Sequence, residues 1–177
     1  MTRKPKHSIP QQEQSFCSPF APHEGGHDVP VHPCVDRAAL DVALELGIPC
    51  GGWCPKGRRS EDGVIPDKYP LQETTIGDYR QRTEWNVRDS DGTLILSIGQ
   101  PSGGTVLTVQ FAEKHLKPCQ VIDLAASSDP STVGEWIKKN SIKTLNVAGP
   151  RGSKQPQAYK LAVELLRQMV ETLSDMS

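Results

Sequence analysis

Two glycine-containing loops hold the residues whose chemistry is easiest to infer. The first is "GQPSGGT", residues 99–105, which leads from an apolar run straight into a helix-like segment. Glycines let a backbone approach a bound group closely, and the free N–H groups at a helix start favour an anion. This loop predicts an anion site, although a plain strand-to-helix turn also uses glycines. The residues concerned are Gly99, Ser102, Gly103, Gly104 and Thr105.

The second loop is "GPRGSK", residues 149–154, at the end of another apolar run. Its glycines, serine and two cations suit an anionic group, with Gly149 and Arg151 the leading contacts, because a guanidinium binds oxyanions in a bidentate manner. A solvated basic loop is the alternative. A third loop, "GGWCPKGRR" at 51–59, offers Lys56, but the acidic residues that follow it also suit a solvated surface.

Signals for catalysis or metal binding are weak. His115 is the sole histidine after residue 34, so no nucleophile and base pair can be proposed from spacing. Cys50 and Cys54, with His32 and Cys34, have the residue types of a four-ligand zinc site. Structural zinc prefers tightly spaced pairs, which disfavours this site. We therefore expect no catalytic and no metal-ligating residue.

Length and charge limit the class of protein. A chain of 177 residues suffices for one domain and is too short for two ordinary ones. The formal net charge of -1 argues against a protein that coats nucleic acid, and no apolar run approaches the roughly 20 residues of a membrane helix. Five cysteines without a secretory signal favour reduced thiols, so we expect a cytoplasmic protein with neither nucleic-acid nor membrane partners.

Residues 1–34 differ in composition from the rest. They hold six of the fifteen prolines and four of the five histidines, but only three Ile, Leu or Val residues. Such a segment buries too little apolar surface to offset the entropy of ordering it, which predicts a disordered or divergent tail. A histidine-rich metal-binding tail is the alternative, which the irregular spacing disfavours. We therefore place a single domain at residues 35–174.

From Val35 onward, helix-like and strand-like segments alternate. The predicted helices are 35–47, 78–88, 105–116, 131–140, with Ser131 as a candidate cap, and 157–173. The predicted strands are 48–53, 93–98, 119–125 and 143–149. This alternation predicts an α/β fold, a Rossmann-like three-layer sandwich with a mostly parallel sheet, whose ligand lies at the carboxyl ends of the strands.

Four collinear segments resemble a known family: "VDRAALDVALELGIPCGGWCPKGRRSEDGVIP", "YPLQETTIGDYRQRTEWNVRDSDGTLIL", "GGTVLTVQFA" and "LNVAGPRGSK". Over most of the chain from Val35 onward, the sequence resembles the molybdenum cofactor carrier proteins, relatives of the lysine decarboxylase-like phosphoribohydrolases. The resemblance implies a homo-oligomer, a tetramer in the family, that binds the molybdenum cofactor and protects it or delivers it to molybdoenzymes. That cofactor is a pterin with a phosphate and a dithiolene-bound molybdenum oxide, which suits an anion-receptive rim.

Two departures from these relatives matter. The phosphoribohydrolases carry a Pro-Gly-Gly-x-Gly-Thr-x-x-Glu loop with a catalytic glutamate, and Thr108 stands at the matching position. Family members also enter the first helix through a strand and a Gly-Gly-Gln-Thr-Gly loop, where this chain has "PVHPC" at residues 30–34. Because proline is excluded from central strands, we expect the first strand to be missing or replaced. A divergent N-terminus or a shifted reading frame would account for it.

The sequence therefore predicts a binding protein for the molybdenum cofactor, impaired by loss of the glycine loop, rather than an enzyme. The alternatives are a phosphoribohydrolase-like enzyme that processes nucleotides and a module that senses a nucleotide ligand. The expected cofactor-binding residues are Asp36, Arg37, Lys56, Gly99, Ser102, Gly103, Gly104, Thr105, Gly149 and Arg151.

Overall fold

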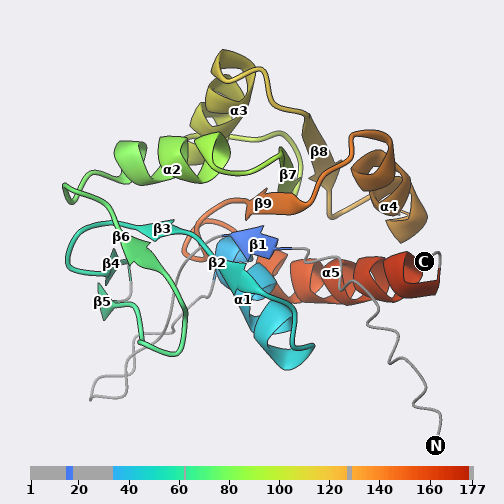
Figure 1. Cartoon of the computed structure of the whole chain (residues 1–177), viewed down its shortest axis with the longest axis horizontal. Coiled ribbons are helices and arrows are strands. Elements are labelled where there is room, and N and C mark those ends of the chain that lie inside the picture. Colours follow the sequence, from blue (N-terminus) through green and yellow to red (C-terminus); the bar gives the residue numbers. More distant parts are fainter. Residues whose placement is uncertain (1–14, 18–33, 62, 127–128, 176–177) are drawn as a thin grey trace, which may run out of the picture.

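The computed structural model describes residues 15–17, 34–61, 63–126 and 129–175 (Figure 1). Their helices are α1 (Val35–Glu45), α2 (Tyr79–Arg88), α3 (Gly104–Lys114), α4 (Pro130–Lys139) and α5 (Ala158–Asp175). Their strands are β1 (Ser15–Cys17), β2 (Cys50–Gly51), β3 (Trp53–Cys54), β4 (Arg59–Ser60), β5 (Gly63–Val64), β6 (Gln72–Glu73), β7 (Gly92–Ser97), β8 (Cys119–Asp123) and β9 (Thr144–Ala148).

Five of these strands form one parallel sheet with the order β2-β1-β9-β7-β8. Helices α2 and α3 lie on one face, and α1 and α5 lie on the other, where α4 packs against α5 (Figure 1). The predicted Rossmann-like α/β fold is therefore confirmed. Sequence pattern found it because crossovers between parallel strands need helices, so strand-like and helix-like segments alternate along the chain.

Strand β1 occupies the position at which we expected a missing or replaced strand. It pairs in parallel with β2 on one side and with β9 on the other, with Phe16 in register with Cys50 and Leu145. Three residues from within the predicted tail thus complete the sheet, so of the two expected alternatives, a missing or a replaced strand, the structure has the replaced one. Residues 1–14 and 18–33, including most of "PVHPC", lie outside the described residues.

The main core lies between the sheet and the α1, α4 and α5 layer. All six residues of β7 are buried, as its unbroken apolar run predicts for a central strand. Helix α5 contributes one apolar face at helical spacing, made of Ala158, Ala162, Leu165, Leu166, Met169 and Leu173. A smaller core under α2 and α3 contains Val87 and Phe111. The burial of these side chains supplies the main stabilisation of the domain.

Beside the main sheet lies a lobe of short strands. The predicted strand 48–53 is wrong in extent, because Gly52 at φ 132° separates β2 in the main sheet from β3, which pairs with β6. Strands β4 and β5 form an antiparallel hairpin. The Arg58 guanidinium donates to four backbone carbonyls of residues 65–71, at 2.9 to 3.1 Å. Arg58 therefore organises this lobe and is not part of a solvated basic surface.

The helix ends show one further correction. Helix α4 begins at Pro130, and the Asp129 carboxylate accepts a hydrogen bond from the Ser131 N–H at 2.9 Å. Asp129 is therefore the cap, and the prediction of Ser131 as the cap is wrong. Proline suits the first helical position because its nitrogen needs no hydrogen-bond partner there. The Asp78 carboxylate caps α2 in the same way.

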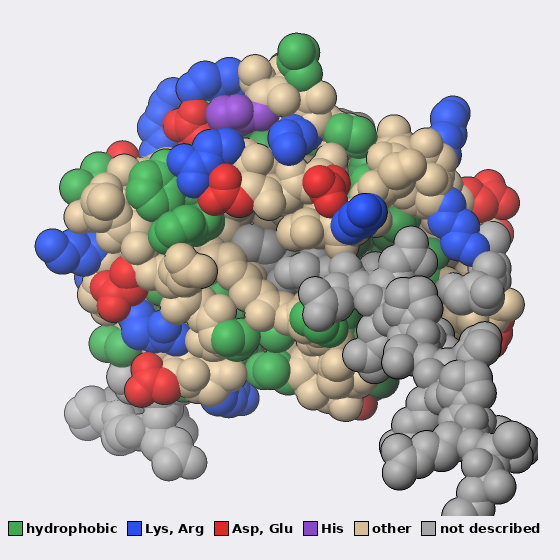
Figure 2. Space-filling model, viewed as in Figure 1, with side chains coloured by type: hydrophobic (Ala, Val, Ile, Leu, Met, Phe, Trp, Pro, Cys, Tyr) green, Lys and Arg blue, Asp and Glu red, His purple; other side chains and the backbone are tan. Residues whose placement is uncertain are grey.

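Charged side chains of both signs lie on the surface. On the face seen in Figure 2, Lys and Arg side chains are interspersed with Asp and Glu side chains, in keeping with a net charge of -1. Among the described residues, no helix has the length and apolar character needed to cross a membrane.

Asp41 joins α1 to α5 and to the loop before β6. Its carboxylate accepts hydrogen bonds from the hydroxyl groups of Tyr69, at 2.7 Å, and Tyr159, at 2.8 Å. Arg37 Nε lies 3.2 Å from the same carboxylate, one helical turn away. Burial raises the pKa of Tyr159 to about 12, and the hydrogen bond to Asp41 adds to this effect.

Replacement of Gly149 by alanine should destabilise the domain. A Cβ at this position would meet the Leu96 carbonyl oxygen and would lie 2.6 Å from Val35 Cβ, so backbone has to move. We expect Gly149→Ala to lower the free energy of unfolding by about 1–3 kcal/mol, the usual cost of overpacking. Gly104→Ala is the control, because its Cβ would meet no atom within 4 Å. Equal urea midpoints for the two variants would contradict this packing.

The Tyr159 hydrogen bond should make the stability of the wild type fall at high pH, a fall that Tyr159→Phe lacks. Because the folded-state pKa of Tyr159 lies above the ordinary value of 10.0, its stabilisation is complete below that value. It is lost as pH rises through about 12, since the unfolded chain then binds fewer protons than the folded one. The stability difference between wild type and Tyr159→Phe, measured by urea unfolding, should shrink above about pH 10. A constant difference would contradict the assignment.

Candidate functional site

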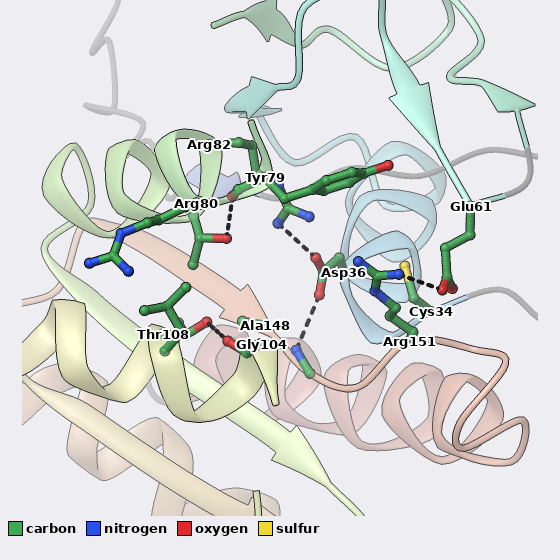
Figure 3. A pocket seen from close by; sticks show the side chains of 13 residues that line it. Cys34, Asp36, Glu61, Tyr79, Arg80, Arg82, Gly104, Thr108, Ala148 and Arg151 are labelled. Atoms are coloured by element: carbon green, nitrogen blue, oxygen red, sulfur yellow. Dashed lines mark hydrogen bonds and ion pairs between the residues drawn. The ribbon is translucent and has the colours of Figure 1, made fainter. Parts of the chain in front are cut away.

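A pocket opens at the carboxyl ends of β7 and β9 (Figure 3). From β9 the sheet extends through β1 to β2 in one direction and through β7 to β8 in the other. The pocket therefore lies between strands whose connections lead outward to opposite edges of the sheet. Open α/β sheets bind ligands at such a point. The lining residues are Cys34, Asp36, Glu61, Tyr79, Arg80, Arg82, Thr83, Gly104, Leu107, Thr108, Ala148, Gly149 and Arg151.

The Asp36 carboxylate connects three sides of this pocket. One oxygen lies 3.2 Å from Arg82 Nη1 of α2, and the other accepts a hydrogen bond from the Gly149 N–H at 3.1 Å. Asp36 is only 6% exposed and stands in the first turn of α1, where a negative charge is favoured by the helix dipole. The pair with Arg82 is therefore a buried one that fixes α2 against α1 and the loop after β9.

Three arginines give the pocket its positive balance. Arg80, Arg82 and Arg151 line it together with two carboxylates, Asp36 and Glu61, which leaves a formal excess of one positive charge. The exposed Arg80 guanidinium lies 5.4 Å from the ring centroid of Phe111. Such a surplus of guanidinium groups favours an anionic ligand, because each group can donate two hydrogen bonds to one phosphate or oxyanion.

An aromatic ring lies beside the arginine at the mouth. The Arg151 guanidinium is 5.3 Å from the ring centroid of Tyr79, and its Nη1 lies 2.9 Å from Glu61 Oε1. The Ser153 hydroxyl also contacts Glu61, at 3.3 Å. Figure 3 shows Arg151 between Asp36 and Glu61 in this view. The pocket thus combines cations with a flat apolar face, a pairing that suits a planar ring with an anionic substituent.

The start of α3 forms another wall. Gly103 precedes the helix with φ 56°, a left-handed conformation that glycine adopts without strain. Gly104 then opens the helix against the pocket, and the Thr108 hydroxyl donates to the Gly104 carbonyl oxygen at 3.1 Å. Thr108 therefore has its hydroxyl directed to the helix backbone.

Cys34 lies at the entrance to α1. Burial raises the pKa of its thiol strongly, and the nearby Asp36 carboxylate raises it further. At neutral pH Cys34 is consequently a protonated thiol, which is a weak nucleophile and a poor metal ligand. His32, the other nearby residue of the zinc site considered on paper, lies outside the described residues.

Four of the ten predicted binding residues line this pocket: Asp36, Gly104, Gly149 and Arg151. They come from the start of α1, the start of α3 and the loop after β9. The fold brings them together because the carboxyl ends of parallel strands meet at one edge of the sheet.

The other six predicted residues do not line it. Arg37 points to Asp41 instead, because consecutive residues of a helix project to different sides. Lys56 is exposed in the turn after β3. The N–H of Gly99 donates to Asp123 at 2.9 Å, which ties β7 to β8. Ser102 and Gly103 shape the loop ahead of Gly104, and Thr105 is buried in the first turn of α3, where its N–H donates to the Ser102 carbonyl at 3.1 Å; none of the three lines the pocket.

Sequence reasoning missed the contribution of α2. Tyr79, Arg82 and Thr83 share one face of this helix at the spacing i, i+3 and i+4, and Arg80 lies at its edge. The sequence did contain a sign of this contribution, because α2 is rich in charged side chains and has almost no apolar stripe. Its buried residues are only Asn86 and Val87. A helix of that kind faces solvent or a polar site. Glu61 was seen only as part of a charged loop.

Residues 32–170 match the family described as the circularly permutated YpsA SLOG family. A similar solved structure is the 1.45 Å crystal structure named "Putative molybdenum carrier protein" from Syntrophus aciditrophicus SB. The two chains are 46% identical with a TM-score of 0.74, and the match covers 78% of this chain and 89% of that chain. No curated protein matches this chain.

The resemblance found in the sequence is confirmed by both comparisons. The matched range contains every residue that lines the pocket, from Cys34 to Arg151. Because this match spans well over half of the chain, the protein belongs to the circularly permutated YpsA SLOG family.

Proposed function

We propose that this protein is a carrier that binds the molybdenum cofactor in the pocket between α1, α2 and α3. The observation that supports the proposal most is the set of three arginines that line the pocket, two of which, Arg82 and Arg151, lie 6.0 and 5.3 Å from the ring centroid of Tyr79. The relative from Syntrophus aciditrophicus, 46% identical, bears the name of a molybdenum carrier. As part of the proposal, the carrier is a homo-oligomer that protects the cofactor and delivers it to molybdoenzymes.

The chemistry of the walls suits the two kinds of group in the cofactor. Arg80 and Arg151 are the exposed guanidinium groups that can meet a phosphate or a molybdenum oxide. Lys154 adds a cation near the start of α3, with its Nζ 3.6 Å from the position that a Cβ on Gly103 would take. The ring of Tyr79 offers a face for the pterin.

Binding is better supported than hydrolysis. Thr108 stands on the pocket wall where the phosphoribohydrolases carry their glutamate, and its hydroxyl already donates to the backbone. The two carboxylates of the pocket are both held by arginines, Asp36 by Arg82 at 3.2 Å and Glu61 by Arg151 at 2.9 Å. Among the lining residues, these are the only carboxylates.

Protein expressed in a host that makes the cofactor should co-purify with molybdenum and a pterin. We expect Arg80→Gln to reduce both contents, with an affinity lower by roughly tenfold, because it removes a charged hydrogen-bond donor from the pocket. Metal analysis and fluorescence of the oxidised pterin measure the two contents. The control is Arg167→Gln, which removes another exposed arginine, on α5, that pairs with Glu45 of α1 away from the pocket.

Equal contents in Arg80→Gln and wild type would exclude this pocket as the site. If neither metal nor pterin accompanies any of these proteins, the result of the following variant decides whether the carrier proposal stands.

A variant in which residues 30–34 are replaced by Gly-Gly-Gln-Thr-Gly should bind the cofactor better than the natural sequence. The glycines restore the loop that family members place before the first helix, and with it backbone N–H groups for an anion. The measurement is again the molybdenum and pterin content after purification. If the variant with the restored loop also lacks both, the carrier proposal is wrong.

A further inference from the structure

An exposed ion pair spans the mouth of the pocket. Glu61, between β4 and β5, bonds to Arg151 in the loop after β9 at 2.9 Å, although the two residues are 90 positions apart. The Ser153 hydroxyl of the same loop contacts both carboxylate oxygens of Glu61, at 3.3 and 3.4 Å. Figure 3 shows Glu61 reaching Arg151 from the side opposite Asp36.

This pair differs from the one between Asp36 and Arg82. The side chains of Arg151 and Glu61 are 55% and 28% exposed, whereas those of Arg82 and Asp36 are 12% and 9% exposed. Exposed pairs contribute roughly 0–1 kcal/mol because water and salt compete for both charges. Another anion can therefore replace Glu61 as the partner of Arg151, while the pair of Asp36 and Arg82 is part of the fixed wall.

The partner of Arg151 also decides what it can bind. Its guanidinium lies over the ring of Tyr79, so an anion bound to Arg151 would lie close to that ring. As long as Glu61 accepts from its Nη1, that donor is occupied and the positive charge is neutralised. A ligand anion must either displace the Glu61 carboxylate or bind in its repulsive field.

We propose that Glu61 competes with the ligand for Arg151, and that the phosphate or oxyanion of the bound ligand displaces the Glu61 carboxylate. This inference rests on the proposed function in that both concern one pocket, and it adds a residue that sets selectivity. A doubly charged group that binds the guanidinium in a bidentate manner displaces the carboxylate more readily than a singly charged or neutral one. Glu61 thereby disfavours weakly charged ligands.

The alternative role of Glu61 is to hold Arg151 in position for the ligand. The two roles predict effects of opposite sign for Glu61→Gln, which keeps the shape of the side chain but removes its charge. Competition predicts tighter binding of an anion, and positioning predicts weaker binding.

The experiment is a calorimetric titration of wild type and Glu61→Gln with adenosine 5′-monophosphate, a planar ring with a dianionic phosphate. We expect the variant to bind about two- to fivefold more tightly, the range for loss of an exposed pair. Glu45→Gln is the matched control, because it removes an exposed carboxylate bonded to Arg167 at 2.6 Å, at the other end of α1. In an Arg151→Gln background, Glu61→Gln should bring no such gain.

Weaker or equal binding by Glu61→Gln, or no binding by it, would overturn the inference. Its outcome can be separated from that of the proposed function, which is measured by metal and pterin content. A gain in nucleotide affinity without any pterin in purified protein supports the role of Glu61 and contradicts the carrier. Pterin content without such a gain supports the carrier and contradicts the role of Glu61.

Discussion

The pocket depends on the buried carboxylate of Asp36. It holds Arg82 of α2 through one oxygen and the Gly149 N–H through the other, so α1, α2 and the loop after β9 share one group. A buried charge that loses its partner costs several kcal/mol, which makes these contacts mutually dependent. The backbone of Gly149, which donates to Asp36, also packs closely against Leu96 and Val35 of the core. The site is therefore formed by the same contacts that join α1 to the sheet.

A fixed pair and an exchangeable pair give the pocket two properties that a carrier needs. The Asp36 and Arg82 pair keeps the walls in place, and its charges largely cancel within the protein. Arg80 and Arg151, both exposed, supply the charge that remains for a ligand. In our proposal such groups bind an anionic cofactor through contacts that water and salt can also compete for, which permits release as well as binding.

The sequence predicted the parts of this structure that local pattern determines. Local sequence pattern revealed the five helices and the buried strand β7, and glycine loops pointed to Gly104 and Gly149. It could not reveal contacts between distant segments, such as Arg82 with Asp36, 46 positions apart. Neighbouring residues were not told apart either, since Arg37 faces Asp41 while Asp36 faces the pocket. Strand β1 was missed because three residues in a polar segment have no detectable period.

The most direct test of this account is a double-mutant cycle between Asp36→Asn and Arg82→Met, measured as free energies of unfolding in urea. If the pair joins α1 to α2 as described, the two changes should not add, and the coupling energy should be about 1 kcal/mol or more. Effects that add to within about 0.5 kcal/mol would show that the two side chains act independently, and would contradict the central place given to Asp36.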